Sequence, residues 1–373
     1  MGASQIKPEF SANLADKKVK AGEQILLRCE ANTDGVLVTW KKDGQKLYCV
    51  DGKHTINKTG TTFYLEITDA QEADEGIYTI HLQNKLGSTS CSAMVTVEVK
   101  EWRIAKWIQD PMVDTLRAFT IGNSEVTELR FLLFGPVGAG KSSIINTIKT
   151  IFEGHQYVNC LAAAESTTSQ TLHFDTYSMA KNGSFPFAFS DIMGLEKELQ
   201  KGVSSNDIIS ALKGHVKDGY TFNSTIPISD GNQYYLRNPR IKDKMHCLVN
   251  VIPADKLTMM EHDFILKMKD VRKAASRMNI PQVVFLTRID RTCQLTKDNL
   301  RNVYKSKKIR EKINECSNTL GIPANCIFPV QNYHEETGIK TDINCLMLDA
   351  LMQIVNWAND YVVRLSDSQA YTQ

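Results

Sequence analysis

The chain has 373 residues, of which 42% are hydrophobic and 23% charged, and its formal net charge is only +2. This length is typical of two or three domains, and the composition supplies enough apolar residues for sizeable cores. The near-neutral charge gives no support to a protein that binds nucleic acid or an anionic membrane. No apolar run approaches the roughly 18 residues of a membrane span, so we expect none.

The N-terminus and the cysteines favour a cytoplasmic protein. The segment MGASQIKPEF lacks the apolar core of a signal peptide, and Ile6 stands where a myristoylation signal needs Ser or Thr. The nine cysteines are scattered and include no Cys-x-x-Cys pair. This pattern argues against both a zinc site and a disulfide framework, and it fits a reducing compartment.

Residues 1–99 have the pattern of an all-β domain. Short alternating apolar runs are separated by Asp-Gly and Thr-Gly turn signals, at the spacing of a β-sandwich. These runs are residues 25–29, 37–40, 63–67 and 93–97. His, Asp and Glu do not cluster in this region as they would in a catalytic site. We therefore expect a spacer or a domain that docks a protein partner, which the sequence does not name.

Individual positions in this domain resemble the intermediate (I-set) type of immunoglobulin domain. Cys29, Trp40 and Tyr78 match the cysteine, the tryptophan and the tyrosine corner of that fold. Ile80 occupies the position of the second cysteine of the usual cross-sheet disulfide. The resemblance implies a core held by apolar packing alone. Cys91 lies further along the chain, where it could approach another thiol, but we expect free thiols.

Residues 100–128 connect this domain to the rest of the chain. Trp102, Trp107 and Ile108 are apolar, and Pro111 is a signal for a turn or a break in regular structure. Two tryptophans this close together favour a packed linker over a free tether. A short helix is expected over residues 112–119.

From residue 129 onward, apolar strand-like runs alternate with helical patterns, which predicts an α/β domain with a mostly parallel sheet. Expected strands cover residues 131–134, 185–190, 247–252, 283–287 and 326–330. Apolar residues recur at helical spacing over residues 264–278 and 348–362, and these stripes are expected to face the core. We expect this domain to cover residues 129–365, followed by a frayed tail at 366–373.

The segment after the first of these strands carries the most specific motif in the chain. Residues 135–142 read Gly-x-x-x-x-Gly-Lys-Ser between a predicted strand and a predicted helix, the context of a phosphate-binding loop. Backbone N–H groups and the start of the helix would cradle phosphate. Lys141 would reach the β- and γ-phosphates, and Ser142 would ligate Mg²⁺. The candidate nucleotide contacts are Gly135, Val137, Gly138, Ala139, Gly140, Lys141, Ser142 and Ser143.

Two later segments are candidates for nucleotide-sensitive switches. Asp191 and Gly194 form an Asp-x-x-Gly motif after a predicted strand. The Asp191 carboxylate would hold Mg²⁺ through water, and the Gly194 N–H would contact the γ-phosphate. Thr167 or Thr168, in a loop of small hydroxyl residues, would complete the Mg²⁺ shell, and the sequence does not choose between them.

The predicted strand at residues 283–287 leads into the segment Thr287-Arg288-Ile289-Asp290. This segment resembles the guanine-reading motif of GTPases. The resemblance assigns Thr287, Arg288 and Asp290 to the nucleotide. A carboxylate can accept hydrogen bonds from both N1–H and the 2-amino group of guanine, which adenine does not offer. Arg288 replaces the usual lysine, and its larger fork could alter affinity or selectivity. Gln331 and Asn332, after the last strand, stand where GTPases place a loop that contacts the base.

Four stretches together resemble the interferon-induced protein 44 and 44-like family: residues 134–143, 191–196, 212–216 and 281–287. This resemblance covers roughly residues 100–365. It implies a cytoplasmic, GTP-binding protein that is induced in antiviral defence. Mammalian members carry a TLDc-type domain at the N-terminus, so an immunoglobulin-like domain is a departure, and partners do not carry over.

The expected rate of hydrolysis is low. Leu195 follows the Asp-x-x-Gly motif where many small GTPases use glutamine to orient water, and Glu196 is not expected to substitute for it. No catalytic residue is therefore assigned. We expect a GTP-binding switch with slow, partner-assisted or self-association-dependent hydrolysis. The alternatives are a catalytically silent nucleotide-binding scaffold and, less in keeping with Asp290, an ATPase. His215 is interpreted as structural.

Overall fold

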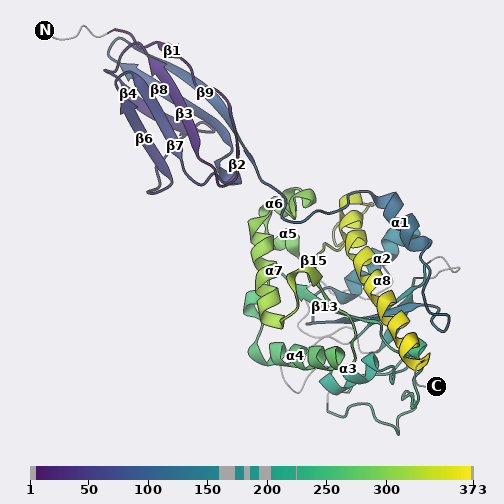
Figure 1. Ribbon diagram of the computed structural model, residues 1–373. Coiled ribbons are helices and arrows are strands. Elements are labelled where there is room, and N and C mark those ends of the chain that lie inside the picture. Colours follow the sequence, from purple (N-terminus) through teal and green to yellow (C-terminus); the bar gives the residue numbers. More distant parts are fainter. Residues whose placement is uncertain (1–5, 159–172, 180–184, 193–202, 224, 371–373) are drawn as a thin grey trace. The chain divides into compact units, whose positions relative to one another are not determined.

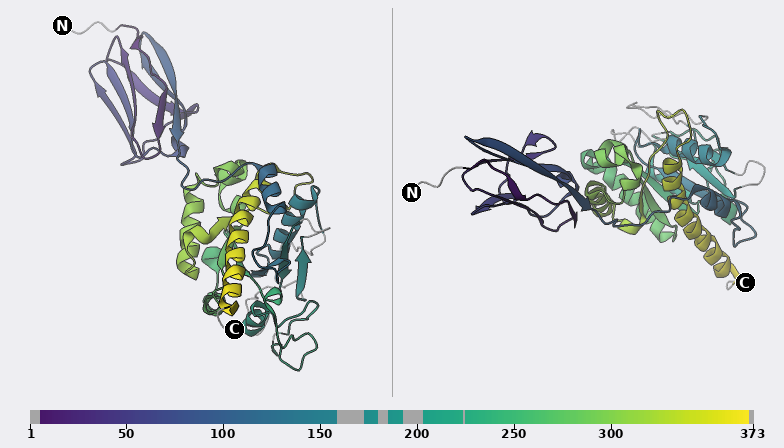
Figure 2. Two further views of the ribbon diagram at one scale, coloured as in Figure 1. Left: turned by 45° about the vertical axis from the view of Figure 1, so that its right-hand side comes forward. Right: turned by 90° about the horizontal axis from the view of Figure 1, so that it is seen from above.

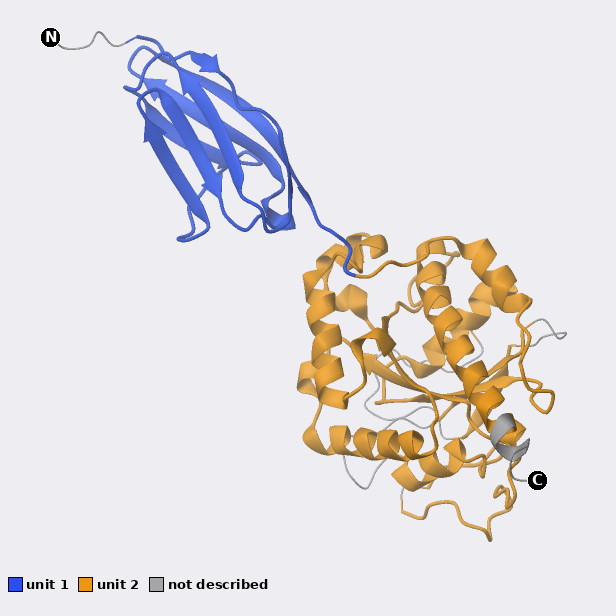
Figure 3. Cartoon of the chain, viewed as in Figure 1, with its two compact units in different colours: residues 1–102 blue, residues 103–373 orange. Residues whose placement is uncertain are grey.

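The computed structural model describes residues 6–158, 173–179, 185–192, 203–223 and 225–370. Its contacts divide the chain into two compact units, unit 1 at residues 1–102 and unit 2 at residues 103–373 (Figure 3).

Unit 1 is built from two β-sheets (Figure 1). The first sheet has the order β1 (Phe10–Ala12), β3 (Ile25–Ala31), β7 (Thr62–Ile67) and β6 (His54–Thr59). The second has the order β2 (Lys17–Lys20), β9 (Gly87–Glu98), β8 (Gly76–Asn84), β4 (Leu37–Lys42) and β5 (Gln45–Lys46). Only β2 and β9 among these neighbours pair in parallel.

The core of unit 1 follows from alternation along its strands. In β3, Ile25, Leu27 and Cys29 are buried, whereas the residues between them face outward. Trp40 from β4 and Ile80 from β8 are buried in the same core. The predicted all-β sandwich is confirmed, and an isoleucine fills the position at which a disulfide would otherwise join the sheets.

The predicted tyrosine corner is also present. The Tyr78 hydroxyl, fully buried, donates a hydrogen bond to the Asp74 carbonyl oxygen at 2.9 Å. The Asp74 side chain accepts from the Gln71 N–H at 2.8 Å and from Lys53 Nζ at 2.6 Å. These contacts fix the short helical turn that leads into β8.

Unit 2 alternates strands and helices, as two further views show (Figure 2). Its strands are β10 (Leu129–Phe134), β11 (Asp175–Ser178), β12 (Phe187–Asp191), β13 (Cys247–Pro253), β14 (Gln282–Thr287) and β15 (Ile327–Pro329). Its α-helices are α1 (Gln109–Arg117), α2 (Lys141–Glu153), α3 (Ser205–Leu212), α4 (His262–Arg277), α5 (Ile289–Thr292), α6 (Gln294–Asp298), α7 (Lys307–Leu320) and α8 (Thr341–Ala370).

These strands form one six-stranded sheet with the order β11-β12-β10-β13-β14-β15. All neighbours pair in parallel except β11, which runs antiparallel to β12 at one edge. Helices α1, α2 and α8 pack together on one face, and α3 and α4 pack together on the other (Figure 1). Because both faces are covered, β13 is buried at every position. The predicted α/β class with a mostly parallel sheet is confirmed.

Element boundaries differ from the sequence expectations by a few residues at several points. The first helix begins at Gln109, with Pro111 in its first turn, where the missing N–H has no intrahelical partner to lose. Helix α8 extends well beyond residues 348–362 on both sides. The edge strand β11 was not expected.

The first residues of unit 2 are anchored to the rest of that unit. The Arg103 guanidinium donates to the carbonyl oxygens of Ala324 and Ile327, each at 2.7 Å, and lies 5.5 Å from the centre of the Tyr304 ring. Trp107 lies under the Arg301 guanidinium, whereas Ile108 is 55% exposed.

A buried histidine beside β13 makes the stability of unit 2 depend on pH. His246 Nδ1 accepts from the Arg130 N–H at 2.9 Å, and Nε2 donates to the Ile241 carbonyl at 3.0 Å. The neutral ring satisfies both contacts, and burial lowers the pKa of His246 to about 4. Between that value and the ordinary 6.5, the unfolded chain binds the extra proton, so stability falls as pH drops through this window.

We expect a loss of roughly 3 kcal/mol when the pH is lowered from 7.5 to 4. Urea unfolding of His246→Gln should show a weaker pH dependence than the wild type over this range. His262→Gln, which changes an exposed histidine, should leave the pH dependence as it is. Equal pH dependence in the wild type and His246→Gln would show that His246 is not responsible.

Every helix in the described part of the chain is too short or too polar to cross a membrane.

Candidate functional site

The candidate site lies at one edge of the unit 2 sheet. Because β10, β12, β13, β14 and β15 are parallel, their carboxyl ends meet at this edge. The phosphate-loop motif follows β10, which lies between β12 on one side and β13 on the other. Such a reversal in strand order leaves a crevice outside the carboxyl ends, where α/β proteins bind ligands.

Three glycines shape the loop between β10 and α2. A Cβ atom on Gly135 would lie 2.1 Å from the Val251 carbonyl oxygen, so only glycine fits against β13. Gly138 and Gly140 have φ values of +71° and +97°, which favour glycine. The chain then enters α2 at Lys141, so the N–H groups of its first turn face the loop.

We expect Gly135→Ala to destabilise unit 2 by about 3 kcal/mol or more, because the methyl group overlaps backbone rather than a movable side chain. Gly154→Ala is the matched control, since φ is +73° there but nothing lies within 4 Å of the added Cβ. It should cost only about 1 kcal/mol. Chemical unfolding of both variants tests the contact, and equal losses would contradict it.

Lys141 is a buried cation with neutral partners. It is 7% exposed, and its Nζ donates to the carbonyl oxygens of Gly135 and Pro136, each at 3.2 Å. Burial lowers the pKa of Lys141, and the Asp191 carboxylate opposes that shift. A desolvated ammonium group beside a loop of N–H donors favours an anion as its counter-charge.

Ser142 and Asp191 meet across the loop. The Ser142 hydroxyl donates to Asp191 Oδ2 at 2.5 Å, and Asp191 is 2% exposed at the end of β12. A hydroxyl and a carboxylate are hard oxygen ligands of the kind that Mg²⁺ prefers in nucleotide sites. Two of the side chains that the sequence assigned to the metal, Ser142 and Asp191, are therefore adjacent in the fold and chemically suited to it.

The segment after β14 is tied to the same loop. The Thr287 hydroxyl donates to the Ala139 carbonyl oxygen at 2.7 Å, and the Arg288 guanidinium donates to the Gly138 carbonyl oxygen. Arg288 also forms an ion pair with Asp255 at 3.6 Å, and its backbone φ is +57°. Arg288 thus links the loop to the residues after β13.

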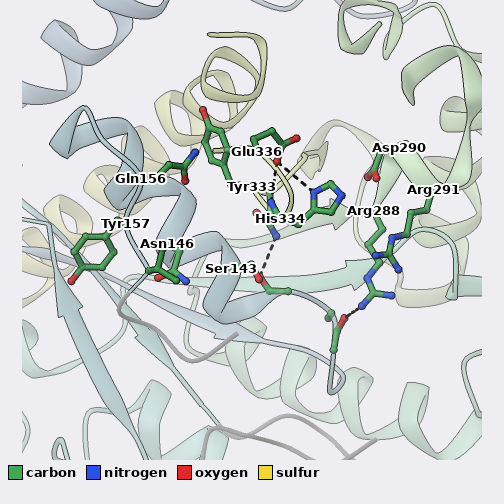
Figure 4. A pocket seen from close by; sticks show the side chains of 15 residues that line it. Ser143, Asn146, Gln156, Tyr157, Arg288, Asp290, Arg291, Tyr333, His334 and Glu336 are labelled. Atoms are coloured by element: carbon green, nitrogen blue, oxygen red, sulfur yellow. Dashed lines mark hydrogen bonds and ion pairs between the residues drawn. The ribbon is translucent and has the colours of Figure 1, made fainter. Parts of the chain in front are cut away.

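A pocket of about 320 Å³ opens beside the loop. Figure 4 shows Arg288, Asp290 and Arg291 on one side, and Asn146, Gln156 and Tyr157 on the other. Of the predicted contacts, Gly138, Ala139, Gly140, Ser143, Arg288, Asp290 and Asn332 line this pocket.

The segment after β15 is held against α2. Asn332 Nδ2 donates to the Gly140 carbonyl oxygen at 3.3 Å, and the Tyr333 N–H donates to Thr147 Oγ1 at 3.2 Å. The Tyr333 hydroxyl donates to Asn344 Oδ1 at 2.8 Å, which joins this segment to α8. This wall of the pocket is therefore fixed by hydrogen bonds that it donates to residues of α2 and α8 and to the loop before α2.

Several of the predicted site residues lie outside the described residues or do not line the pocket. Gly194, Thr167 and Thr168 lie outside the described residues, as do Leu195 and Glu196. Gln331 is not among the residues that line the pocket. His215 stacks on Tyr235 with ring centres 4.9 Å apart, and its Nδ1 lies 2.8 Å from the Leu236 carbonyl oxygen, which agrees with a structural role.

Several lining or supporting residues were not predicted from the sequence. Asp255 follows a predicted strand, so the rule that ligand sites gather at carboxyl ends would have pointed to it. Tyr157 and Gln156 come after α2 and offered no local signal. The other missed lining residues are Asn146, Val158, Arg291, Tyr333, His334 and Glu336.

Comparison with known proteins identifies unit 1. Residues 8–97 match the family model described as the immunoglobulin I-set domain. Among solved structures, the titin M3 domain is 29% identical, covering 25% of this chain and 99% of that chain with a TM-score of 0.24.

Among the curated proteins that this chain resembles are two human relatives. Interferon-induced protein 44-like of Homo sapiens is 34% identical over 240 residues, which are 64% of this chain and 53% of that protein. Interferon-induced protein 44 of Homo sapiens is 30% identical over 265 residues, which are 70% of this chain and 59% of that protein. The chain thus spans between half and two thirds of the length of these relatives. Both matches are far longer than unit 1, so they lie largely in unit 2. The chain therefore joins an immunoglobulin I-set domain to an α/β unit that is similar in sequence to interferon-induced proteins 44 and 44-like.

Proposed function

We propose that unit 2 binds GTP or GDP together with Mg²⁺ and acts as a nucleotide-dependent switch. The observation that carries this proposal is the meeting of three features at one sheet edge. These are the buried Lys141 in a glycine loop, the Ser142–Asp191 pair, and a pocket lined by Asp290 and Asn332.

Each phosphate-side residue has a role that its surroundings support. Lys141 would exchange its two carbonyl partners for phosphate oxygens, which neutralises a buried charge. The loop and the first turn of α2 supply N–H donors. Ser142 and Asp191 would hold Mg²⁺, directly or through water. When bound, this ion screens the phosphate charge and polarises the terminal phosphate.

On the base side, Asp290 is the specificity-determining residue in this proposal. Its carboxylate accepts from two guanine donors that adenine lacks. The side chains of Asn332 and Thr287 donate hydrogen bonds to loop carbonyl oxygens, so they would position the base-binding walls. Arg288 is engaged with Gly138 and Asp255, which places its guanidinium between the loop and the β13 end.

The biological setting is inferred from the relatives. Their names describe them as interferon-induced, which supports a role for this chain in an immune response. An antiviral role in the cytoplasm is part of our proposal. Unit 1 would supply a protein-binding surface, because immunoglobulin sandwiches bind partners through sheet edges and loops. Nucleotide-dependent self-association is part of the same proposal.

Hydrolysis is proposed to be slow without a partner or self-association. Leu195 has no hydrogen-bonding side chain with which to orient water. The same observation favours the second candidate, a nucleotide-binding scaffold without catalysis. Single-turnover hydrolysis over a range of protein concentrations separates the two. A rate that rises with concentration supports the switch, and no turnover at any concentration supports the scaffold.

Nucleotide binding itself is tested by displacement of a fluorescent guanine nucleotide with unlabelled GTP, GDP and ATP. We expect GTP and GDP to compete and ATP to fail. Equal competition by ATP would overturn the guanine assignment and favour an ATPase. Failure of the fluorescent nucleotide to bind would overturn the proposed function.

A further inference from the structure

Two cysteines from opposite sheets meet in the core of unit 1. Cys29 lies on β3 of the first sheet and is 1% exposed. Cys91 lies on β9 of the second sheet and packs, partly buried, against the same core. Cys29 Sγ lies 4.0 Å from the Phe63 carbonyl oxygen, and the Cys29 and Cys91 thiols also interact with each other through their side chains. The sulfur atoms are therefore neighbours, although both thiols are free.

Strand register explains this meeting. Cys91 on β9 is the direct partner of Ile80 on β8, and residues opposite one another in a ladder share a face. Ile80 points into the core, so Cys91 does as well. Ile80 on β8 occupies the position where an immunoglobulin domain usually has its second cysteine. Cys91 lies directly beside it, on the neighbouring strand β9.

The two thiols have different environments. The side-chain interaction with Cys29 and a hydrogen bond from the Leu14 N–H, at 3.5 Å, stabilise the Cys91 thiolate. They lower the pKa of Cys91 to about 7 despite the opposing effect of burial. The pKa of Cys29 is raised by the same side-chain interaction and by burial. This difference favours Cys91 over Cys29 as the attacking thiol in an exchange reaction.

We propose that Cys29 and Cys91 form a reversible intramolecular disulfide that joins the two sheets of unit 1 under oxidising conditions. The oxidant is a low-molecular-weight disulfide such as oxidised glutathione. This site is independent of the nucleotide site proposed for unit 2.

The chemistry proceeds in two exchange steps. The Cys91 thiolate attacks one sulfur of oxidised glutathione, and the first glutathione leaves as a thiolate that takes up a proton. Cys29 loses its proton and attacks Cys91 Sγ in the mixed disulfide, which releases the second glutathione. Two protein thiols are thereby oxidised to one disulfide, and one glutathione disulfide is reduced to two thiols.

The cross-link would close a long loop and constrain the unfolded state of unit 1. It would also tie β9, the last strand of unit 1, to β3 across the core. Oxidised unit 1 should therefore unfold at higher urea concentration than reduced unit 1. The redox state would then set how readily this domain opens.

The experiment incubates the full-length protein, under native conditions, in buffers with increasing ratios of oxidised to reduced glutathione. Remaining thiols are alkylated, and the peptides are mapped by mass spectrometry. We expect a Cys29–Cys91 linked peptide that accumulates with the ratio and disappears on reduction. The urea midpoint of unit 1 should rise in parallel.

Two variants keep the outcome clear. Cys49→Ser removes an exposed cysteine of the same unit and should change neither result. Cys91→Ser should abolish both the linked peptide and the shift in midpoint. The proposal is overturned if both thiols remain alkylated at every ratio. It is also overturned if Cys91 stops at a glutathione adduct, or if it pairs with Cys49 instead of Cys29.

Discussion

Replacement of Lys141 by Met is expected to weaken GTP binding by at least about 100-fold, since charge-assisted hydrogen bonds from a buried ammonium group to phosphate are among the strongest in such a site. Methionine has a similar volume, so the loop should keep its shape. The free protein should be as stable as the wild type or slightly more stable, because burial disfavours the charge and lowers the pKa of Lys141.

Fluorescence titration with a labelled guanine nucleotide measures the first effect, and urea unfolding measures the second. Lys308→Ala, which removes an exposed lysine on α7, is the control and should bind like the wild type. Unchanged affinity in Lys141→Met would mean that the buried ammonium does not contact the nucleotide.

The second large effect concerns base selection by Asp290. Asp290→Asn should weaken GTP binding by about 100-fold, because the new amide meets the 2-amino group donor to donor. Xanthosine triphosphate carries an oxygen at that position, so the same variant should bind it better than the wild type does. This gain is informative because general damage to the fold would not produce it.

Displacement assays with GTP, ATP and xanthosine triphosphate test this exchange of preference. Asp263→Asn, at an exposed position of α4, serves as the matched control. If Asp290→Asn binds all three nucleotides as the wild type does, Asp290 does not read the base.

Much of the fold could be predicted because its signals are local. A pattern of apolar residues indicates directly which positions are buried. The alternation at residues 25–29 and the apolar run at 247–252 both predicted strands, and both are strands in the structure. Strand β11 was missed because its four residues, Asp-Thr-Tyr-Ser, are mostly polar and it lies at the sheet edge. Helix α7 was not identified either, although Ile309, Ile313, Cys316 and Leu320 are buried at helical spacing.

The site was predictable where a motif fixes geometry and unpredictable where distant segments meet. The glycine-loop motif predicted that Lys141 and Ser142 lie at the start of the helix after the loop, and α2 begins there. The ion pair between Arg288, which follows β14, and Asp255, which follows β13, could not be predicted from any local sequence pattern. The contact of the Arg288 guanidinium with the loop carbonyl of Gly138 was also not predicted from the sequence. The proximity of Cys29 and Cys91 likewise depends on sheet packing and on the register of β8 and β9.

The most direct test of the central claim is calorimetric titration of the nucleotide-free, full-length protein with GTP in the presence of Mg²⁺. We predict saturable binding at one site per chain, loss of that binding in Lys141→Met, and no measurable heat of binding with ATP. If neither nucleotide binds, or if ATP binds as tightly as GTP, unit 2 is not a guanine-nucleotide site.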